Sequence, residues 1–164
     1  MDNRSSINNL FGNIADQLGF QVVLGDNNLC NIKSKSTGEE YIVELPNNGD
    51  ILYIYSAITD VPFDHRESIF EYILRINLHG IETSRCIIGI DGRTNKFILS
   101  RPLPIDGLNE TMLLNAMNDF FAILPTIREG IEQHLQAQIS GNNAAHQAPT
   151  IPGNTLSGNF NFIA

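Results

Sequence analysis

The sequence predicts an α+β fold, in which three helices pack on one antiparallel, twisted sheet. Two observations carry this prediction. Apolar residues recur with a helical period in three segments, and shorter apolar runs bounded by turn-forming residues lie between those segments. The resulting element order is α-βββ-α-ββ-α. Helices and strands therefore do not alternate one to one, which disfavours a doubly wound parallel sheet.

The first helix is predicted over residues 7–18, where apolar side chains recur at spacings of three and four. Ser5 or Ser6 is expected to cap its start, because a side-chain oxygen accepts a hydrogen bond from a free backbone N–H. Gly19 fits its end, where a left-handed backbone conformation is least costly without a Cβ.

Three strands are expected next, over residues 29–33, 40–45 and 51–57. Short stretches rich in turn-forming residues separate them. Connections this short join antiparallel neighbours, so the three strands form a meander. Residues 21–24, which precede the meander, form either a short strand or an extended connection.

The second helix is predicted from Asp64, its expected cap, to about Leu78. Its apolar residues cover roughly 200° of the helix circumference, whereas one stripe facing a core needs only about 100°. A helix with this pattern is expected to contact two surfaces, its own sheet and something else.

Two further strands are predicted over residues 85–91 and 96–101, joined by a tight turn at 91–95. The third helix begins near Leu108. Pro125 is expected to kink or end it, although apolar residues continue at steps of four as far as Ile139.

The charge balance excludes several classes of partner. The chain of 164 residues has 18 acidic and 10 basic residues, a formal net charge of −8. Nucleic-acid binding needs a basic surface that replaces counterions on phosphates, and an acidic surface does not dock on anionic membranes. With 42 % apolar and 17 % charged residues the chain is predicted to fold rather than to be disordered.

Motifs that carry chemistry are missing from the sequence. No two of the four histidines have metal-ligand spacing, and there is no GxSxG motif or glycine-rich phosphate loop. Cys30 and Cys86 are interpreted as free thiols in a reducing cytosol. No apolar run has the length of a signal-peptide core or a membrane span. We therefore expect a soluble cytoplasmic protein that is not an enzyme and has no cofactor or metal.

Surplus apolar surface is the feature that points to a function. The strands carry apolar residues on both faces, and the second helix carries more than one core contact requires. Soluble monomers seldom leave large contiguous apolar patches exposed. The surplus suggests a homodimer, a groove for a partner, or both.

An ordered set of segments resembles a known family. The set consists of ADQLG at 15–19, NLCNI at 28–32, YIVELP at 41–46, ILYIY at 51–55, YILRINL at 72–78 before Gly80, CIIGID at 86–91 and FILSR at 97–101. In this order, and over roughly residues 7–135, the chain resembles the type III secretion chaperones of the Tir-chaperone (CesT-like) family. No single segment is diagnostic, and the resemblance lies in the ordered pattern.

The resemblance implies an acidic homodimer in the bacterial cytosol. Such a chaperone binds the N-terminal region of one or more secreted effector proteins in extended form and keeps them competent for secretion. The secretion ATPase is a further candidate partner, whereas nucleic acid and membrane are not. Neither catalysis nor a cofactor is implied.

Two sets of residues are candidates for these contacts. We expect the effector to lie over the first helix and the adjoining strands, on exposed members of a set some of which must be core: Ile7, Leu10, Phe11, Ile14, Leu29, Ile32, Ile42 and Val43. The second helix and a neighbouring strand are expected to make the dimer contact, with intramolecular core as the alternative, through Ile69, Tyr72, Ile73, Ile76, Ile88 and Ile90.

The chain divides into a chaperone-like domain, residues 1–139, and a flexible tail, residues 140–164, which carries no charged residue. Two interpretations of the tail stay open: a disordered end, or a tethered apolar strand built on Phe160 and Phe162 that occupies a groove. The alternative function for the whole chain is an α+β module that binds a protein or ligand unrelated to secretion.

Overall fold

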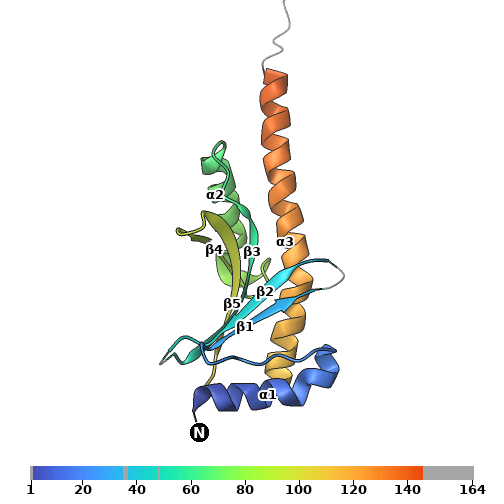
Figure 1. The fold of residues 1–164 in the computed structure, drawn as a ribbon. Coiled ribbons are helices and arrows are strands. Elements are labelled where there is room, and N and C mark those ends of the chain that lie inside the picture. Colours follow the sequence, from blue (N-terminus) through green and yellow to red (C-terminus); the bar gives the residue numbers. More distant parts are fainter. Residues whose placement is uncertain (1, 35–36, 48, 146–164) are drawn as a thin grey trace, which may run out of the picture.

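The computed structural model describes residues 2–34, 37–47 and 49–145 (Figure 1). Three helices, a short 3-10 turn and five strands follow one another in the expected order α-βββ-α-ββ-α. The elements are α1 (Asn3–Leu18), β1 (Leu29–Lys33), β2 (Glu40–Glu44), β3 (Ile51–Asp60), α2 (Arg66–Ile76), η1 (Leu78–Gly80), β4 (Ile87–Asp91), β5 (Lys96–Pro104) and α3 (Glu110–Ala145).

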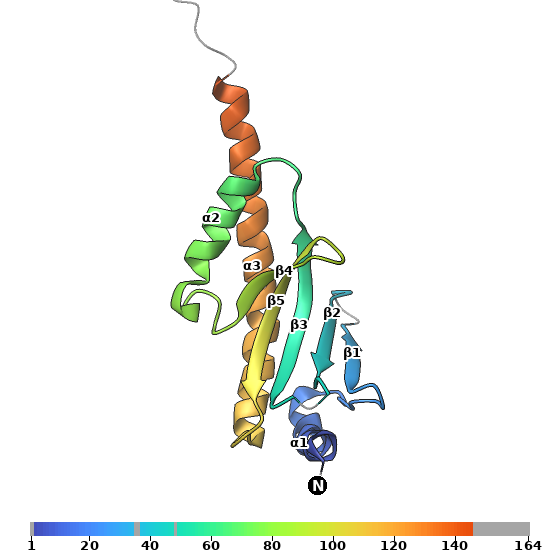
Figure 2. The same cartoon turned by 90° about the vertical axis from the view of Figure 1, so that its left-hand side faces the viewer.

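The five strands form one antiparallel sheet in the order β1-β2-β3-β5-β4, which confirms the predicted fold class (Figure 2). Strands β3 and β5 are longer than expected because they pair with each other from Ile51 and Pro104 to Asp60 and Lys96. A register shift between Ala57 and Thr59 interrupts that ladder, as a bulge does when a long strand bends. Residues 21–24 are an extended connection and not a strand.

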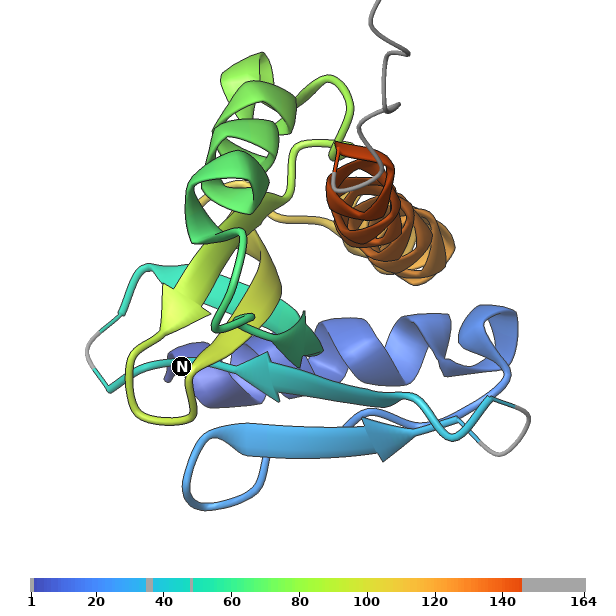
Figure 3. The ribbon, with the colours of Figure 1, turned by 90° about the horizontal axis from the view of Figure 1, so that it is seen from above.

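All three helices pack on one face of this sheet (Figure 3). Residues alternate along each strand between a buried face and a face that is half-buried or exposed, as the period of two requires. The buried side chains of the sheet join those of the helices in a single core. Phe11 and Ile14 of α1, Ile69 of α2 and Phe120 of α3 are completely enclosed there.

Helix α1 begins earlier than predicted because a different residue caps it. Asp2, not Ser5 or Ser6, is the N-cap, and its Oδ1 accepts a hydrogen bond of 2.7 Å from the backbone N–H of Ser5. Gly19 ends the helix in the left-handed conformation, with φ 79°, as expected. Its N–H donates to the carbonyl of Ala15 at 2.9 Å, which satisfies one of the free carbonyls of the last turn.

Helix α2 is shorter at both ends than predicted. His65, not Asp64, is its N-cap, and it has a left-handed backbone and no side-chain capping bond. The helix ends at Ile76 because the side chain of Asn77 is bonded to β4. The Asn77 amide donates to the carbonyl of Ile88 and accepts from its N–H, both at 2.9 Å.

Helix α3 continues through Pro125 without ending there. An interior proline costs a helix about 3 kcal/mol, and the burial of Ile127 and Ile131 beyond it offsets that cost. The helix also passes the expected domain boundary at residue 139 and reaches Ala145. The two aromatic residues singled out in the tail lie outside the described residues.

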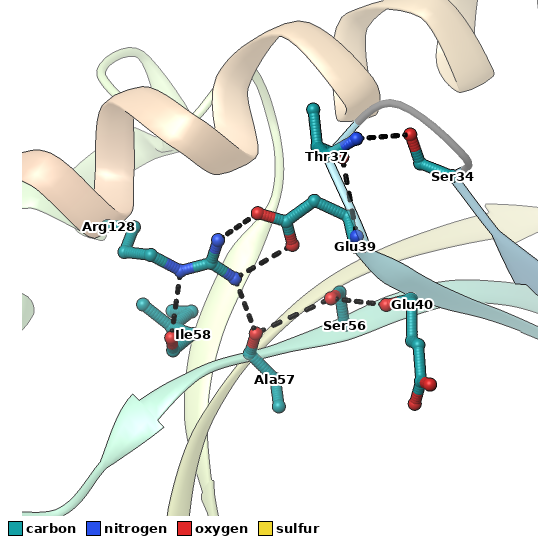
Figure 4. A network of polar contacts seen from close by, with 8 residues as sticks. All are labelled: Ser34, Thr37, Glu39, Glu40, Ser56, Ala57, Ile58 and Arg128. Carbon is teal, nitrogen blue, oxygen red and sulfur yellow. Dashed lines mark hydrogen bonds and ion pairs between the residues drawn. The ribbon is translucent and has the colours of Figure 1, made fainter.

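Arg128 joins α3 to the sheet at the point where the helix passes the end of β3 (Figure 4). Its Nε and Nη2 donate to the carbonyls of Ile58 and Ala57, each at 3.0 Å. The guanidinium also forms a two-bond ion pair with Glu39, which precedes β2. The hydrogen bond to Glu39 is the main reason why the pKa of Arg128 is raised. One side chain thus connects three elements.

Replacing Arg128 with methionine is expected to lower the free energy of unfolding by roughly 2 kcal/mol, because two carbonyls and a half-buried carboxylate lose a charged donor. Urea denaturation measures the change. The matched control is Arg75→Met, which removes an exposed pair with Glu71 and is expected to cost at most about 0.5 kcal/mol. Equal losses in the two variants would contradict the role of Arg128.

Candidate functional site

A groove runs along β1, between the end of α1 and the middle of α3. Its volume is about 620 Å³. We call it the β1 groove, and its lining residues are Gly19, Phe20, Gln21, Asn31, Ile32, Lys33, Ser34, Tyr41 and Phe121.

Aromatic side chains from three elements make the wall of the β1 groove. The left-handed turn at Gly19 ends α1 and places Phe20 against Phe121, with ring centroids 6.0 Å apart. Tyr41 from β2 meets the same Phe121 ring edge-on at 4.7 Å. Burial is the main reason why the pKa of Tyr41 is raised, so its phenol is neutral at physiological pH. Ile32 lies opposite Tyr41 in the β1–β2 ladder. The groove therefore offers an apolar, aromatic floor beside a strand.

The two edges of the sheet differ in what they offer to a new strand. The outer edge of β1 pairs with no strand in the described part of the chain. On β4, the opposite edge strand, the side chain of Asn77 occupies both the N–H and the carbonyl of Ile88. An edge strand with unpaired backbone groups is a template for a further strand, and a bonded edge is not. On β1 itself, Leu29 is already bonded, because its carbonyl accepts from the N–H of Gly25 and its own N–H donates to the side chain of Asn27. The part of the β1 edge that can accept a strand is therefore the rest of the strand, from Asn31 to Lys33.

The second face of the sheet carries no helix in the part of the chain that the structure describes. Tyr53 and Tyr55 of β3 lie on it, half-buried, and the register places Ile42 beside Tyr55. The Tyr55 hydroxyl donates to Glu44 at 2.8 Å. Burial first, and then this hydrogen bond, raise the pKa of Tyr55 to about 12. The open face is therefore an aromatic surface on which the Tyr55 phenol stays protonated at physiological pH.

A second apolar surface follows the chain from α2 into β4. We call it the α2–β4 patch, and it consists of Leu74, Leu78, Ile81 and Ile87, whose exposed fractions are 72, 63, 80 and 55 %. Asn77 fixes the end of α2 against β4, so the segments that carry these four residues are neighbours. An exposed apolar surface of this kind indicates an interaction site.

The structure does not bring the eight residues predicted for effector contact together. Four of them are core residues: Ile7, Phe11, Ile14 and Val43 are at most 2 % exposed. Their side chains complete the packing between α1, the sheet and α3, and they are closed to a ligand in this structure.

The other four predicted effector residues are half-buried and lie on three surfaces. Ile32 lines the β1 groove. Leu10 lines a separate hollow of about 520 Å³ with the residues that begin α3. Leu29 and Ile42 lie on the open face of the sheet, because β1 pairs Leu29 with Glu44 and the period of two turns them away from Ile32. Only Ile32 therefore belongs to the β1 groove.

The residues predicted for the dimer contact are mostly core. Ile69, Ile73, Ile76 and Ile88 are at most 6 % exposed, because that side of α2 packs on the sheet and on α3. Tyr72 is half-buried and stacks on His134 of α3, with ring centroids 4.7 Å apart. Ile90 is 48 % exposed.

Sequence reasoning missed the aromatic residues of the groove and the aliphatic residues of the patch. Phe20 directly follows a glycine that ends a helix, and Phe121 directly follows Phe120. Since adjacent positions on a helix point about 100° apart, one of two consecutive phenylalanines must leave the core. Leu74 and Leu78 belong to the over-wide arc of the second helix, but the prediction took the opposite side of that arc.

Two further kinds of site were sought in the described residues, a metal site and a membrane span. These residues contain no group of three or more His, Cys, Asp or Glu side chains that could hold a metal ion. Within the same part of the chain, none of the helices has both the length and the apolar character that crossing a membrane requires.

The sequence pattern of the Tir chaperone protein (CesT) family matches residues 9–128. The chain belongs to this family. The match extends from the middle of α1 to Arg128, so it contains the sheet, α2 and the β1 groove of this CesT-family chain. No curated protein sequence is significantly similar to it.

Solved structures share the fold of this CesT-family chain at low sequence identity. A chain in the crystal structure of the ExsC–ExsE complex superposes with a TM-score of 0.64 at 16 % identity, covering 79 % of this chain and 96 % of that one. The HopA1–SchA chaperone–effector complex gives 0.61 at 14 % identity, with coverage of 81 % and 98 %. The Yersinia pestis type III secretion chaperone SycH, in complex with a fragment of YscM2, gives 0.55 at 15 %, with 73 % and 97 %. At these identities the likeness establishes the fold.

Substitutions in α1 and β1 are expected to distinguish core residues from groove residues by their effect on the free energy of unfolding. Phe11→Ala is expected to lower the free energy of unfolding by about 3–5 kcal/mol, because it empties an enclosed site. Ile32→Ala, in the half-buried groove, is expected to cost about 1 kcal/mol. Urea denaturation of the two variants measures the difference. Losses of the same size would mean that Ile32 is core and that the β1 groove has no free apolar floor.

Proposed function

We propose that the protein is a type III secretion chaperone that binds the N-terminal region of a secreted effector protein in extended form in the bacterial cytosol. The observation that supports this most directly is the pairing of a free strand edge with an apolar groove. A partner strand bonds through its backbone and places alternate side chains in pockets.

The β1 edge can bond the backbone of such a ligand, and the β1 groove can hold its side chains. Backbone hydrogen bonds along the outer edge of β1 are independent of the effector's sequence, so one chaperone can accept varied segments. Side chains of the added strand that point to the helix side meet Ile32, Phe20 and Phe121. Side chains that point the other way meet Leu29 and Asn31 on the open face of β1.

The ligand is expected to be an unfolded segment and not a folded domain. The hollows in the described residues are shallow and distributed over several surfaces. Ordering an extended segment is entropically costly, and contact over a large area offsets that cost. The HopA1–SchA structure, a chaperone–effector complex, supports the same interpretation.

A homodimer is part of the proposal, with the α2–β4 patch as its contact. The four exposed aliphatic side chains of the patch are the ones that a second copy could cover. A stable interface buries about 800 Å² on each partner, so open-face residues beside Ile87 would join it. The protein acts by binding alone in this proposal, without catalysis. The secretion ATPase remains a candidate partner for delivery.

Ile32→Asp is expected to weaken binding of the effector's N-terminal segment at least about tenfold, because a carboxylate replaces the apolar floor of the groove. The ligand is the N-terminal segment of a secreted protein that co-purifies with the wild-type chain from its native host, and isothermal titration calorimetry measures its affinity. Hydrogen exchange should become slower at the β1 amides of the wild-type chain when the segment binds.

The matched control is Val23→Asp. Val23 is 59 % exposed and does not line the β1 groove, so the same charge is introduced without filling the site. This variant should bind as the wild type does. Unchanged affinity in Ile32→Asp, or unaltered exchange at β1, would refute effector binding at this edge.

Ile81→Asp is expected to turn the dimer into a monomer without lowering its stability, because the side chain is 80 % exposed within one chain. Sedimentation equilibrium at micromolar concentration measures the mass of each variant. Phe63→Asp is the control, since Phe63 is 90 % exposed but lies before α2. A monomeric wild-type chain, or a dimer that survives Ile81→Asp, would refute the α2–β4 patch as the contact.

A further inference from the structure

Arg101 is a buried cation in a row of apolar residues. It lies on the helix-covered face of β5 between Leu99 and Leu103, opposite Ile54 of β3. The residue is 7 % exposed. A charge removed from water in this way is costly unless it is paired and hydrogen-bonded.

The chain satisfies only part of the hydrogen-bonding capacity of this guanidinium. Its Nη1 donates to the backbone carbonyl of Ser84. Its Nη2 is 3.9 Å from Oδ2 of Asp119, which is beyond hydrogen-bond distance. The buried thiol of Cys86 is a further hydrogen-bond partner of the guanidinium. No fully enclosed side-chain nitrogen or oxygen of the described residues lacks a partner, so the N–H groups of Arg101 that these contacts leave over still reach open space.

That space is a hollow of about 600 Å³ between the end of β5, the turn after η1 and the first turns of α3. Its walls are polar and apolar in about equal parts, and both Arg101 and Asp119 line it. The lining residues are Ser84, Arg85, Arg101, Pro102, Leu103, Pro104, Met112, Asn115, Ala116 and Asp119.

A structural role for Arg101 explains its bonds to Ser84 and Cys86 but not the N–H groups that face Asp119 beyond hydrogen-bond distance. Ser84 and Arg85 both have left-handed backbones, with φ of 51° and 63°. The bond from Nη1 to the Ser84 carbonyl holds this turn in place. Nε and Nη2 take no part in it.

We propose that the hollow binds the carboxylate of an aspartate or glutamate side chain carried by the effector segment, a proposal that rests on the proposed function. Neighbouring nitrogens of a guanidinium match the two oxygens of a carboxylate. Arg101 and Arg85 together outweigh Asp119, so the hollow is locally positive in a chain whose net charge is −8. An acidic side chain finds little attraction elsewhere on such a surface.

A side chain, and not another strand, is the form of ligand that suits this place. Strand β4 pairs with β5 only as far as Ser100, so the following edge of β5 has no strand beside it in the described chain. Pro102 and Pro104 lie on that edge. Because proline has no N–H, the edge is a poor template for pairing. An effector that leaves the β1 edge can therefore anchor here through one acidic residue.

The test uses two capped tripeptides, acetyl-Leu-Glu-Leu-amide and acetyl-Leu-Gln-Leu-amide, and the ¹⁵N-labelled full chain. Both peptides are too short to fill the groove and the hollow together. The glutamate peptide is expected to shift the Nε–H resonance of Arg101 and to bind at least about tenfold more tightly than the glutamine peptide. Equal affinity for the two peptides, or no shift at Arg101, would overturn the proposal.

Variants separate this site from the β1 groove. Asp119→Asn removes the competing carboxylate and is expected to strengthen binding of the glutamate peptide severalfold. Arg101→Lys keeps the charge but not the two-nitrogen geometry, and should abolish the preference for glutamate. If Asp119→Asn weakens binding, or the preference for the glutamate peptide survives in Arg101→Lys, the Arg101 guanidinium does not bind the carboxylate.

Ile32→Asp, which disables the groove, should leave the tripeptide result unchanged. Loss of the Arg101 shift in Ile32→Asp would mean that the peptide reports on the groove, and would overturn the proposal. Failure of effector binding at β1 appears in the calorimetric experiment instead. The two hypotheses therefore fail independently.

Discussion

One constraint organises this molecule: a single face of a single sheet must bury all three helices. The alternation of β2, β3 and β5 supplies that face, and their inward side chains form one core with α1, α2 and α3. The surfaces that this core leaves uncovered follow from the same constraint. The second face of the sheet stays open, the outer side of α2 stays uncovered, and the last turns of α3 extend past the end of the sheet (Figure 1).

Arg128 shows how polar contacts support this arrangement. The apolar contacts of α3 bring it to the sheet, and the guanidinium fixes the helix to the backbone of β3 and to Glu39 ahead of β2. Because Glu39 precedes the strand that carries Tyr41, the same network supports the wall of the β1 groove. The binding surface thus depends on a contact made outside it. Arg101 differs, since its internal partners leave donor capacity unused.

The fold could be predicted because the spacing of apolar residues along the sequence indicates each helix and strand locally. Spacings of three and four define α1, and the glycine at 19 ends it for a reason that is visible in the sequence. Boundaries were harder where a distant residue decides them: the side chain of Asn77 bonds to Ile88 and ends α2, and no local pattern indicates this. The binding residues were harder still. Burial of Phe11 and exposure of Ile32 depend on which neighbours cover them, and Phe11 and Leu10 carry the same hydrophobic signal in the sequence.

The different states of the two sheet edges also govern how copies of the chain can associate. A protein with two free edges can stack head to tail without limit, as fibrils do. Here the backbone of Ile88 is already bonded by Asn77, so the β1 edge of one molecule finds no matching partner at that point on β4 of the next. Pairing of β1 with β4 between copies is therefore disfavoured at this position. The same side chain that ends α2 thus also makes this edge of the sheet a poorer template for a second copy.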